Sequence, residues 1–262
     1  MDITEIRRRV KALRRRLHQF HVDGLLVMGV ENVRYLTGFC GHDSWVLVTG
    51  RSVFLVTDSR YTEQAQSECL GCKIIQRKGS IVKEAASLLQ KCGDVKLLGI
   101  EDSCSVAMLK MLQKKLPTKI KPVNQAVESL RMVKSEGEIK LIQKAGKIAF
   151  DAMQWALAQL KPGMTELEFA ALYEYRVRSY NAKPGFETIV CFGPNGSRNH
   201  HQPGKRKLQK NDTILVDFGA NYEGYISDMT RCFAVGKVTD YFRKIYETVA
   251  LAQKAAIEKV RD

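Results

Sequence analysis

Apolar residues recur at two different spacings along the chain, and the change of spacing predicts its elements. Residues 1–20 carry apolar positions at helical intervals, so the chain is expected to begin with a helix. Short β-branched runs follow (GLLVMGV, SWVLVTG, SVFLVTD and KLLGI), interspersed with helical patterns (TEQAQSECL, SIVKEAASLLQKC and SVAMLKMLQKKL). Short strands alternating with helices predict an α/β domain, a mixed sheet covered by helices, over residues 1–128.

The second half begins with longer helices. Ser135 and Glu138 form a capping box before a one-sided apolar stripe of about seven turns. Thr165 and Glu168 repeat that signal before the next helix. The apolar spacing then falls to two through ETIVCFG, TILVDFGA and GYISDMTRCFAVG, which predicts strands joined by hairpins, and an amphipathic helix follows. Residues 129–262 are therefore expected to form an α+β domain.

The net charge of +14 raises the question of a nucleic-acid or membrane partner. The basic residues are densest in the first helix, where the apolar positions share one face and the arginines are expected on the opposite, solvated face. No basic run alternates with aromatic residues, so no nucleic acid is expected. Neither a signal peptide nor a run of about 20 apolar residues is present, so no membrane partner is expected either.

Seven cysteines are scattered through the chain without the spacing of a disulfide framework. An odd number at such positions favours reduced thiols and a cytoplasmic location. Cys69 and Cys72 form a CxxC motif, but a zinc site would need a second ligand pair, and Cys92 stands alone. These cysteines are therefore interpreted as ordinary surface or core thiols.

Asp217 and Asp228 lie on either side of a predicted hairpin turn. A turn centred on Tyr222 and Glu223 would place the two aspartates directly opposite each other, and a turn centred on Glu223 and Gly224 would make them diagonal neighbours. Both registers put the two side chains on one face of the hairpin, whereas an odd-length loop without a bulge would separate them.

The segments that flank the two aspartates are apolar, so both carboxylates are expected to point toward an interior, with one facing solvent as the alternative. Two buried like charges need a shared proton, a cationic side chain or a metal ion. An all-oxygen pair suits hard or borderline divalent ions such as Mn²⁺. His200 and His201 lie upstream in a loop rich in Gly, Asn and Pro, where histidines are more often surface residues than catalytic ones. His200 could donate a proton or hydrogen bond to a substrate carbonyl.

Several motifs together resemble the creatinase/aminopeptidase P/prolidase family of metallopeptidases. The segments ENVRYLTGF and FLVTDSRYTEQA resemble its amino-terminal domain, and ESLRMVKSEGEIKLIQKA resembles its inter-domain helix. LKPGMTELEFA follows, and NHHQPGKRKLQKNDTILVDFGANYEGYISDMTRCFAVG resembles the start of its pita-bread catalytic fold. The motifs occur in the family's order over nearly the whole chain.

The resemblance implies the chemistry of an Xaa-Pro aminopeptidase or dipeptidase. Asp217 would be the first metal ligand, Asp228 would bridge two metals, and His200 would be the substrate-side histidine. The resemblance also implies two divalent ions, Mn²⁺ or otherwise Zn²⁺ or Co²⁺, a peptide substrate with proline at its second position, and a homodimer. No histidine follows His201, so the family's histidine ligand and its two later glutamates are not supplied. The chain is accordingly expected to be a carboxyl-terminally truncated form, inactive by itself.

Two other functions fit parts of the pattern. A methionine aminopeptidase shares the two-aspartate hairpin, although the amino-terminal domain argues against it. A non-catalytic binding module on the same architecture would explain the missing ligands, whereas the retained aspartates and His200 favour a peptidase.

Overall fold

The computed structural model describes residues 2–261, which divide into two compact units between Lys134 and Ser135. The helix α6, which begins at the expected boundary residue Glu128, belongs to the first unit. The first unit contains α1 (Ile3–Phe20), β1 (Gly24–Val27), α2 (Val30–Thr37), β2 (Trp45–Thr49), β3 (Val53–Thr57), α3 (Thr62–Glu68), β4 (Lys73–Gln76), α4 (Ile81–Cys92), β5 (Leu97–Glu101), α5 (Val106–Lys115), β6 (Lys119–Val123) and α6 (Glu128–Met132).

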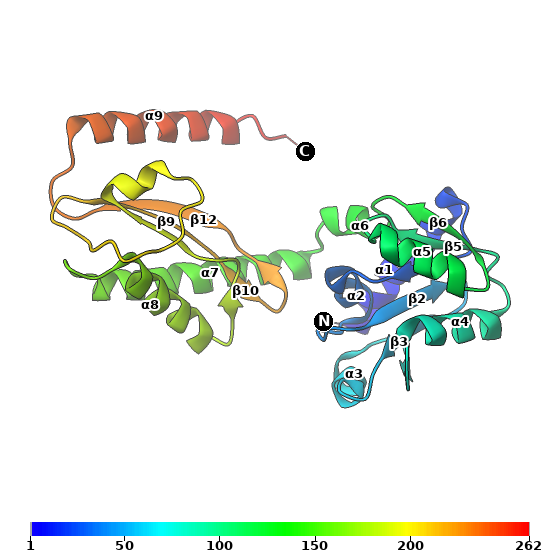
Figure 1. Cartoon of the computed structure of the whole chain (residues 1–262). Helices are drawn as coiled ribbons and strands as arrows, with labels where there is room; N and C mark the ends of the chain where they lie inside the picture. The colour runs from blue at the N-terminus through cyan, green and yellow to red at the C-terminus, as the bar shows by residue number, and fades with distance from the viewer. Residues whose placement is uncertain (1, 262) are drawn as a thin grey trace. The chain divides into compact units, whose positions relative to one another are not determined.

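The first unit is built on a six-stranded mixed sheet (Figure 1), with the strand order β4-β3-β2-β1-β5-β6. The contacts β1–β2 and β2–β3 are antiparallel, and the other three are parallel. Side chains that alternate along β1 enter different cores: Leu25 and Val27 pack with α1 and α2, whereas Leu26 packs with α4 and α5. Both faces of the sheet are therefore covered by helices, which confirms the predicted α/β architecture.

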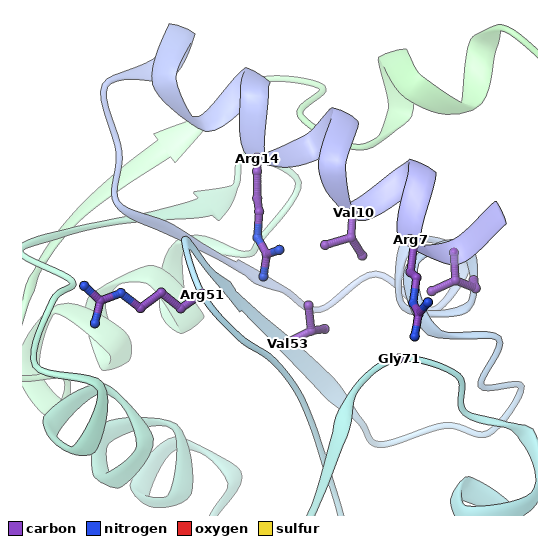
Figure 2. A pocket seen from close by; sticks show the side chains of 7 residues that line it. Arg7, Val10, Arg14, Arg51, Val53 and Gly71 are labelled. Carbon is purple, nitrogen blue, oxygen red and sulfur yellow. The ribbon is translucent and has the colours of Figure 1, made fainter. Parts of the chain in front are cut away.

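Helix α1 buries the predicted apolar face, but the expectation that its arginines all face solvent is wrong for Arg9. The Arg9 side chain is buried because Glu5 Oε1 lies 3.0 Å from its Nε and the carbonyl oxygen of Tyr35 accepts a bond of 3.0 Å from Nη1. Its guanidinium also lies 4.0 Å from the centre of the Tyr35 ring. Arg14, whose side chain is drawn in Figure 2, is half-buried. Its Nε donates a 2.9 Å bond to the carbonyl oxygen of Thr49. Part of the charge on this helix therefore stabilises the fold.

The second unit packs two long helices against a sheet. Its elements are α7 (Glu136–Gln159), α8 (Glu166–Ser179), β7 (Lys183–Pro184), β8 (Ile189–Phe192), η1 (Gly193–Ser197), β9 (Thr213–Phe218), β10 (Ala220–Tyr222), β11 (Tyr225–Ile226), β12 (Met229–Ala234) and α9 (Asp240–Ile257). Both predicted capping boxes are present, at Ser135 and at Thr165. The strands form two three-stranded sheets, β8-β9-β12 in that order and β7-β10-β11 with β10 in the middle.

Strand β9 presents its two faces to different surroundings. Ile214, Val216 and Phe218 are buried with apolar residues of α7 and α8, which lie along this face (Figure 1). Leu215 and Asp217 consequently belong to the opposite face, because successive side chains of a strand alternate. The core that holds β9 in place therefore also determines the direction of the Asp217 carboxylate.

The expected final helix is α9, and none of its described residues is buried. Thr239 caps its amino terminus with a 3.1 Å bond from Phe242 N to Thr239 Oγ1. Several apolar side chains along it are largely exposed, Tyr241 at 74% and Leu251 at 69% among them. Across residues 2–261, no helix is both long and apolar enough to cross a membrane.

Candidate metal and peptidase site

The hairpin that carries the two aspartates turns at Glu223 and Gly224. Both residues have positive φ angles, of 48° and 79°, which are the angles that a two-residue hairpin turn of type I′ requires. Tyr222 pairs with Tyr225 across this turn, and the same register continues into β9 and β12. Of the two predicted registers, the one centred on Glu223 and Gly224 is confirmed, and the one centred on Tyr222 and Glu223 is wrong.

This register brings the two aspartates together as diagonal neighbours. Asp217 lies directly opposite Thr230, whose hydroxyl donates a 3.0 Å hydrogen bond to Asp217 Oδ1. Asp228 is two positions before Thr230 and therefore falls on the same face of the hairpin. The carboxylates of Asp217 and Asp228 are close enough to affect each other's charge.

Burial raises the pKa of Asp217 above the ordinary carboxyl value. The Thr230 hydroxyl opposes this rise, while the charge of Asp228 and a hydrogen bond with it add to the rise. A group that resists ionisation beside a second carboxylate gains from a nearby cation. The electrostatics of the pair thus favour a bound positive charge.

The prediction that both carboxylates point into an interior is wrong for Asp228. Asp217 is partly buried, but Asp228 is exposed. The face of the β8-β9-β12 sheet that packs against α7 and α8 is the one opposite Asp217, so that core does not enclose the pair. The alternative, in which one of the two carboxylates faces solvent, is confirmed.

The raised pKa of Asp217 predicts how stability depends on pH in the metal-free chain. The folded state holds the Asp217 proton more tightly than the unfolded state does. The contribution of Asp217 to the free energy of unfolding is therefore greatest below the carboxyl pKa of the unfolded chain, about 3.9. It is lost as pH rises through the pKa of Asp217 in the folded chain. We expect Asp217→Asn to remove that fall and to gain stability relative to the wild type as pH increases. Denaturant unfolding at about pH 4 and about pH 7 measures the difference.

Glu223→Gln is the matched control for that experiment, because it removes one negative charge from the exposed turn of the same hairpin. Its difference from the wild type should not share the pH trend of Asp217→Asn. Equal trends in both variants would contradict a specific effect of burial at Asp217.

The two adjacent histidines have different surroundings. His200 is exposed, and no hydrogen bond from its side chain to another residue between 2 and 261 is found. His201 is largely buried, and its Nε2 lies 2.9 Å from Glu166 Oε2 and 3.3 Å from the side-chain nitrogen of Asn195. His201 is therefore the histidine that holds the loop, whereas His200 faces solvent.

Glu166, the first residue of α8, holds that loop and was missed by sequence reasoning. Its fully buried carboxylate accepts hydrogen bonds from Phe192 N at 2.8 Å, from the Asn195 side chain at 2.8 Å and from Gly204 N at 3.1 Å, besides the contact with His201. Burial by itself would raise the pKa of Glu166, but these bonds together hold it below the ordinary value. The carboxylate ties the start of α8 to the loop that carries His200.

A signal for Glu166 was available in the sequence. Glu166 precedes Phe169, Ala170, Tyr173 and Val177 by 3, 4, 7 and 11 positions, the spacing of one helical face, and all four are buried. A carboxylate on the apolar face of a helix must have partners inside the protein. Its partners are far along the chain, so the sequence pattern did not identify them.

The two aspartates fit a metal ion in part. Oxygen ligands and a repelling pair of carboxylates suit a divalent cation of the Mn²⁺ type. Within residues 2–261, however, no group of three or more His, Cys, Asp or Glu side chains is placed to hold a metal ion. The described part of the chain therefore brings together two carboxylates, those of Asp217 and Asp228, without a third such side chain beside them.

Comparisons with known proteins agree with the architecture of both units. Residues 9–133 match the Creatinase/Prolidase N-terminal domain, and residues 140–262 match Metallopeptidase family M24. The chain is 35% identical over 256 residues to the "Uncharacterized peptidase YqhT" of Bacillus subtilis. The matched region covers 97% of this chain and 72% of that relative. It is 32% identical to an "Xaa-Pro dipeptidase" of Pyrococcus horikoshii, over 100% of this chain and 73% of the relative.

Solved structures give the same result. The Xaa-Pro dipeptidase from Bacillus anthracis superimposes with a TM-score of 0.90 at 31% identity, covering 95% of this chain and 70% of that one. The prolidase from Pyrococcus horikoshii OT3 has a TM-score of 0.89 at 31% identity, covering 97% of this chain and 72% of that one.

The fold and the sequence relatives define a hydrolase of the M24 metallopeptidase class, with a creatinase-like amino-terminal domain and part of a pita-bread domain. The chain belongs to the creatinase/aminopeptidase P/prolidase family. Metal dependence is expected of this family, as its M24 description states. The family resemblance noted from the sequence motifs is thereby confirmed.

Proposed function

We propose that the chain contributes the amino-terminal domain and the first metal ligands of a dinuclear Xaa-Pro peptidase. The observation that carries the proposal is the register of β9 and β12, which sets Asp217 and Asp228 side by side on one face of the sheet. Asp217 would bind one ion, and Asp228 would bridge two. Mn²⁺ fits these oxygen ligands best, with Zn²⁺ or Co²⁺ as alternatives. When bound, such ions would supply an activated water and polarise the scissile carbonyl.

The protein's own residues would prepare the site for this chemistry. The Thr230 hydroxyl orients Asp217 through its hydrogen bond to Oδ1. The contact between Glu166 and His201 anchors the loop that presents His200. His200, exposed and adjacent to that anchor, would donate a hydrogen bond or a proton to the substrate carbonyl. His200 is thus the proposed catalytic residue, and His201 is a positioning residue.

The proposed substrate is a peptide with proline at its second position. Support comes from relatives and solved structures that are named Xaa-Pro dipeptidase or prolidase. A homodimer and a cytoplasmic location belong to the same proposal, the latter from the odd number of cysteines without a disulfide framework. Because the described residues bring together only one side of a metal site, hydrolysis is expected to require further ligands.

Titration calorimetry with Mn²⁺ tests the proposal on the chain itself. Two carboxylates supply few ligands, so we expect weak binding, with a dissociation constant on the order of 10⁻³ M. Asp228→Ala should weaken that binding at least about tenfold, because a single carboxylate then remains at the site. Glu223→Gln, which removes the same charge from the same hairpin, should leave the isotherm unchanged. Identical isotherms for the wild type and Asp228→Ala would rule out a metal site at these aspartates.

A second candidate is a non-catalytic binding module on the same architecture. It is favoured by the exposure of Asp228 and by the lack of a third metal ligand near the pair among residues 2–261. A module of this kind has no need for Mn²⁺, so aspartate-dependent Mn²⁺ binding would decide against it.

A further inference from the structure

The CxxC segment joins helix α3 to the edge strand β4, and both of its ends are held in place. Cys69 ends α3, and its backbone N–H donates a 2.9 Å bond to the carbonyl oxygen of Ala65. Cys72 immediately precedes Lys73, which pairs with Phe54 of β3. Between them, Leu70 N donates a 3.0 Å bond to the carbonyl oxygen of Thr37. The two thiols are thus fixed by secondary structure on either side of a short turn.

Gly71 makes this turn possible. Its φ of +72° lies in the left-handed region, which glycine adopts at little cost. The chain bends there, and both cysteine side chains pack against the hydrophobic core that α1 and α2 share with the sheet. The two thiols therefore lie beside the same core, on either side of a two-residue turn.

We propose that Cys69 and Cys72 form a reversible dithiol–disulfide pair, a modification site that reacts with small disulfides such as glutathione disulfide. A disulfide needs only two thiols whose sulfur atoms can approach each other, and the turn at Gly71, with both side chains packed on the same core, allows that approach. A metal site would need more, and no cluster of three or more potential ligands for a metal occurs in the described chain. Oxidation is therefore the chemistry that fits the pair.

The two cysteines have different parts in the reaction. The neighbouring Cys69 thiol lowers the pKa of Cys72, and this effect outweighs that of burial. The neighbouring Cys72 raises the pKa of Cys69 well above its usual range, and burial adds to the rise. Because the thiolate is the nucleophile in thiol–disulfide exchange, Cys72 is the attacking residue and Cys69 the resolving one.

The reaction balances with one small disulfide as the oxidant. The Cys72 thiolate attacks one sulfur of glutathione disulfide, forms a mixed disulfide and releases one glutathione thiolate, which takes up a proton. Cys69 then loses its proton and attacks the Cys72 sulfur, which releases the second glutathione. The protein loses two electrons and two protons, and the reagent is reduced to two thiols.

A small reagent can reach the segment from solvent. Gly71 lines a surface pocket of about 220 Å³ together with Arg7, Arg14 and Arg51. Figure 2 shows Arg7 extending from α1 toward Gly71. Both cysteines are only partly buried. The basic lining suits an anionic reagent such as glutathione disulfide.

The test is a redox titration of the native full chain in glutathione buffers, followed by acid quenching, alkylation and tryptic peptide mapping. Cleavage after Arg60 and Lys73 releases residues 61–73, which contain Cys69 and Cys72 and no other cysteine. In the wild type we expect this peptide to lose two hydrogen atoms and to carry no alkyl group. Cys92, the single thiol on peptide 92–96, is the matched control. The ratio of glutathione disulfide to glutathione that oxidises half of the Cys69–Cys72 pair should be at least about tenfold lower than the ratio that modifies half of Cys92.

Two further measurements make the result specific. In Cys69→Ser, Cys72 should accumulate as a glutathione adduct, because no resolving thiol remains. The same titration in concentrated guanidinium should require a more oxidising buffer than the native chain, because the fold holds the thiols together. Equal native and denatured midpoints, two alkyl groups on the wild-type peptide at every ratio, or linkage of Cys69 to Cys40 on peptide 35–51 would each overturn the proposal.

Discussion

Glu166→Gln is expected to lower the free energy of unfolding of the second unit by about 3–5 kcal/mol. The carboxylate is fully buried and accepts from two backbone N–H groups, of Phe192 and Gly204, besides the side chains of Asn195 and His201. A glutamine amide keeps the shape but replaces one acceptor by a donor, so at least one buried donor loses its partner. The loop over residues 193–206 should lose order together with this carboxylate.

The measurement can be confined to the affected unit. The chain has two tryptophans, Trp45 in the first unit and Trp155 in the second. A Trp45→Phe background makes fluorescence report on Trp155 alone during denaturant unfolding. Glu168→Gln is the control, since Glu168 is an exposed capping-box residue of the same helix. Glutamine can keep the capping box, so this variant should lose far less stability than Glu166→Gln. Equal losses in the two variants would show that the buried network contributes nothing beyond a helix cap.

The pH dependence gives this carboxylate an independent signature. Hydrogen bonds hold the pKa of Glu166 below its ordinary value despite burial, so its stabilising contribution is present above the unfolded carboxyl pKa and is lost as pH falls through the folded one. Asp217 has the opposite sign, because its pKa is raised. The two carboxylates of one unit therefore respond to acid in opposite directions.

The long elements were predictable because their signals are local. The capping box at Ser135 and Glu138 determines where α7 begins, and the alternation of Ile214, Val216 and Phe218 determines which face of β9 is buried. In both cases the residues that form the pattern also make the contacts that stabilise the element. The sequence therefore contained enough information for these elements and for the fold class.

The elements that went unpredicted depend on distant partners. The strand β6 contains Pro122 and two lysines and is largely exposed, so it lacks the regular apolar pattern that marks a strand. Its order comes from pairing with β5 at the edge of the sheet. The burial of Arg9 has the same origin, because the carbonyl of Tyr35, 26 residues along the chain, accepts from its guanidinium.

The sequence predicted part of the candidate site, namely the face that Asp217 and Asp228 share. Both hairpin registers that were considered placed Asp217 and Asp228 on one face, so this conclusion did not depend on choosing between them. The choice depended on the positive φ of Glu223, a non-glycine residue, which the sequence does not reveal. The exposure of Asp228 depended on which face of the sheet the helices cover, and this is a property of the assembled unit.

The largest effect on activity is expected at Asp217, in a chain extended by the part of its relatives' length that it does not span, about 28% for YqhT. If the proposed site is correct, such a chain should hydrolyse an Xaa-Pro dipeptide with Mn²⁺, and Asp217→Ala should lower kcat/KM by about 10³-fold or more, equivalent to about 4 kcal/mol of transition-state stabilisation. Loss of this carboxylate removes a ligand and leaves Asp228 as the only acidic group of the pair, so added Mn²⁺ should not restore activity.

Glu223→Gln in the same extended chain separates a ligand from a merely nearby charge. Glu223 lies at the exposed turn of the hairpin that carries both aspartates, so this variant changes the net charge equally while leaving the β9–β12 register intact. Its kcat/KM should stay within about twofold of the wild type, because exposed charges at such a distance are screened by salt. Two outcomes would mean that Asp217 acts only through the charge of the hairpin. In the first, the activity of Asp217→Ala recovers at high Mn²⁺, and in the second, both variants lose kcat/KM equally. A loss confined to Asp217→Ala would support a ligand role for this carboxylate. Burial raises its pKa in the metal-free chain because it disfavours the negative charge. The same burial strengthens the attraction of that charge to a bound cation.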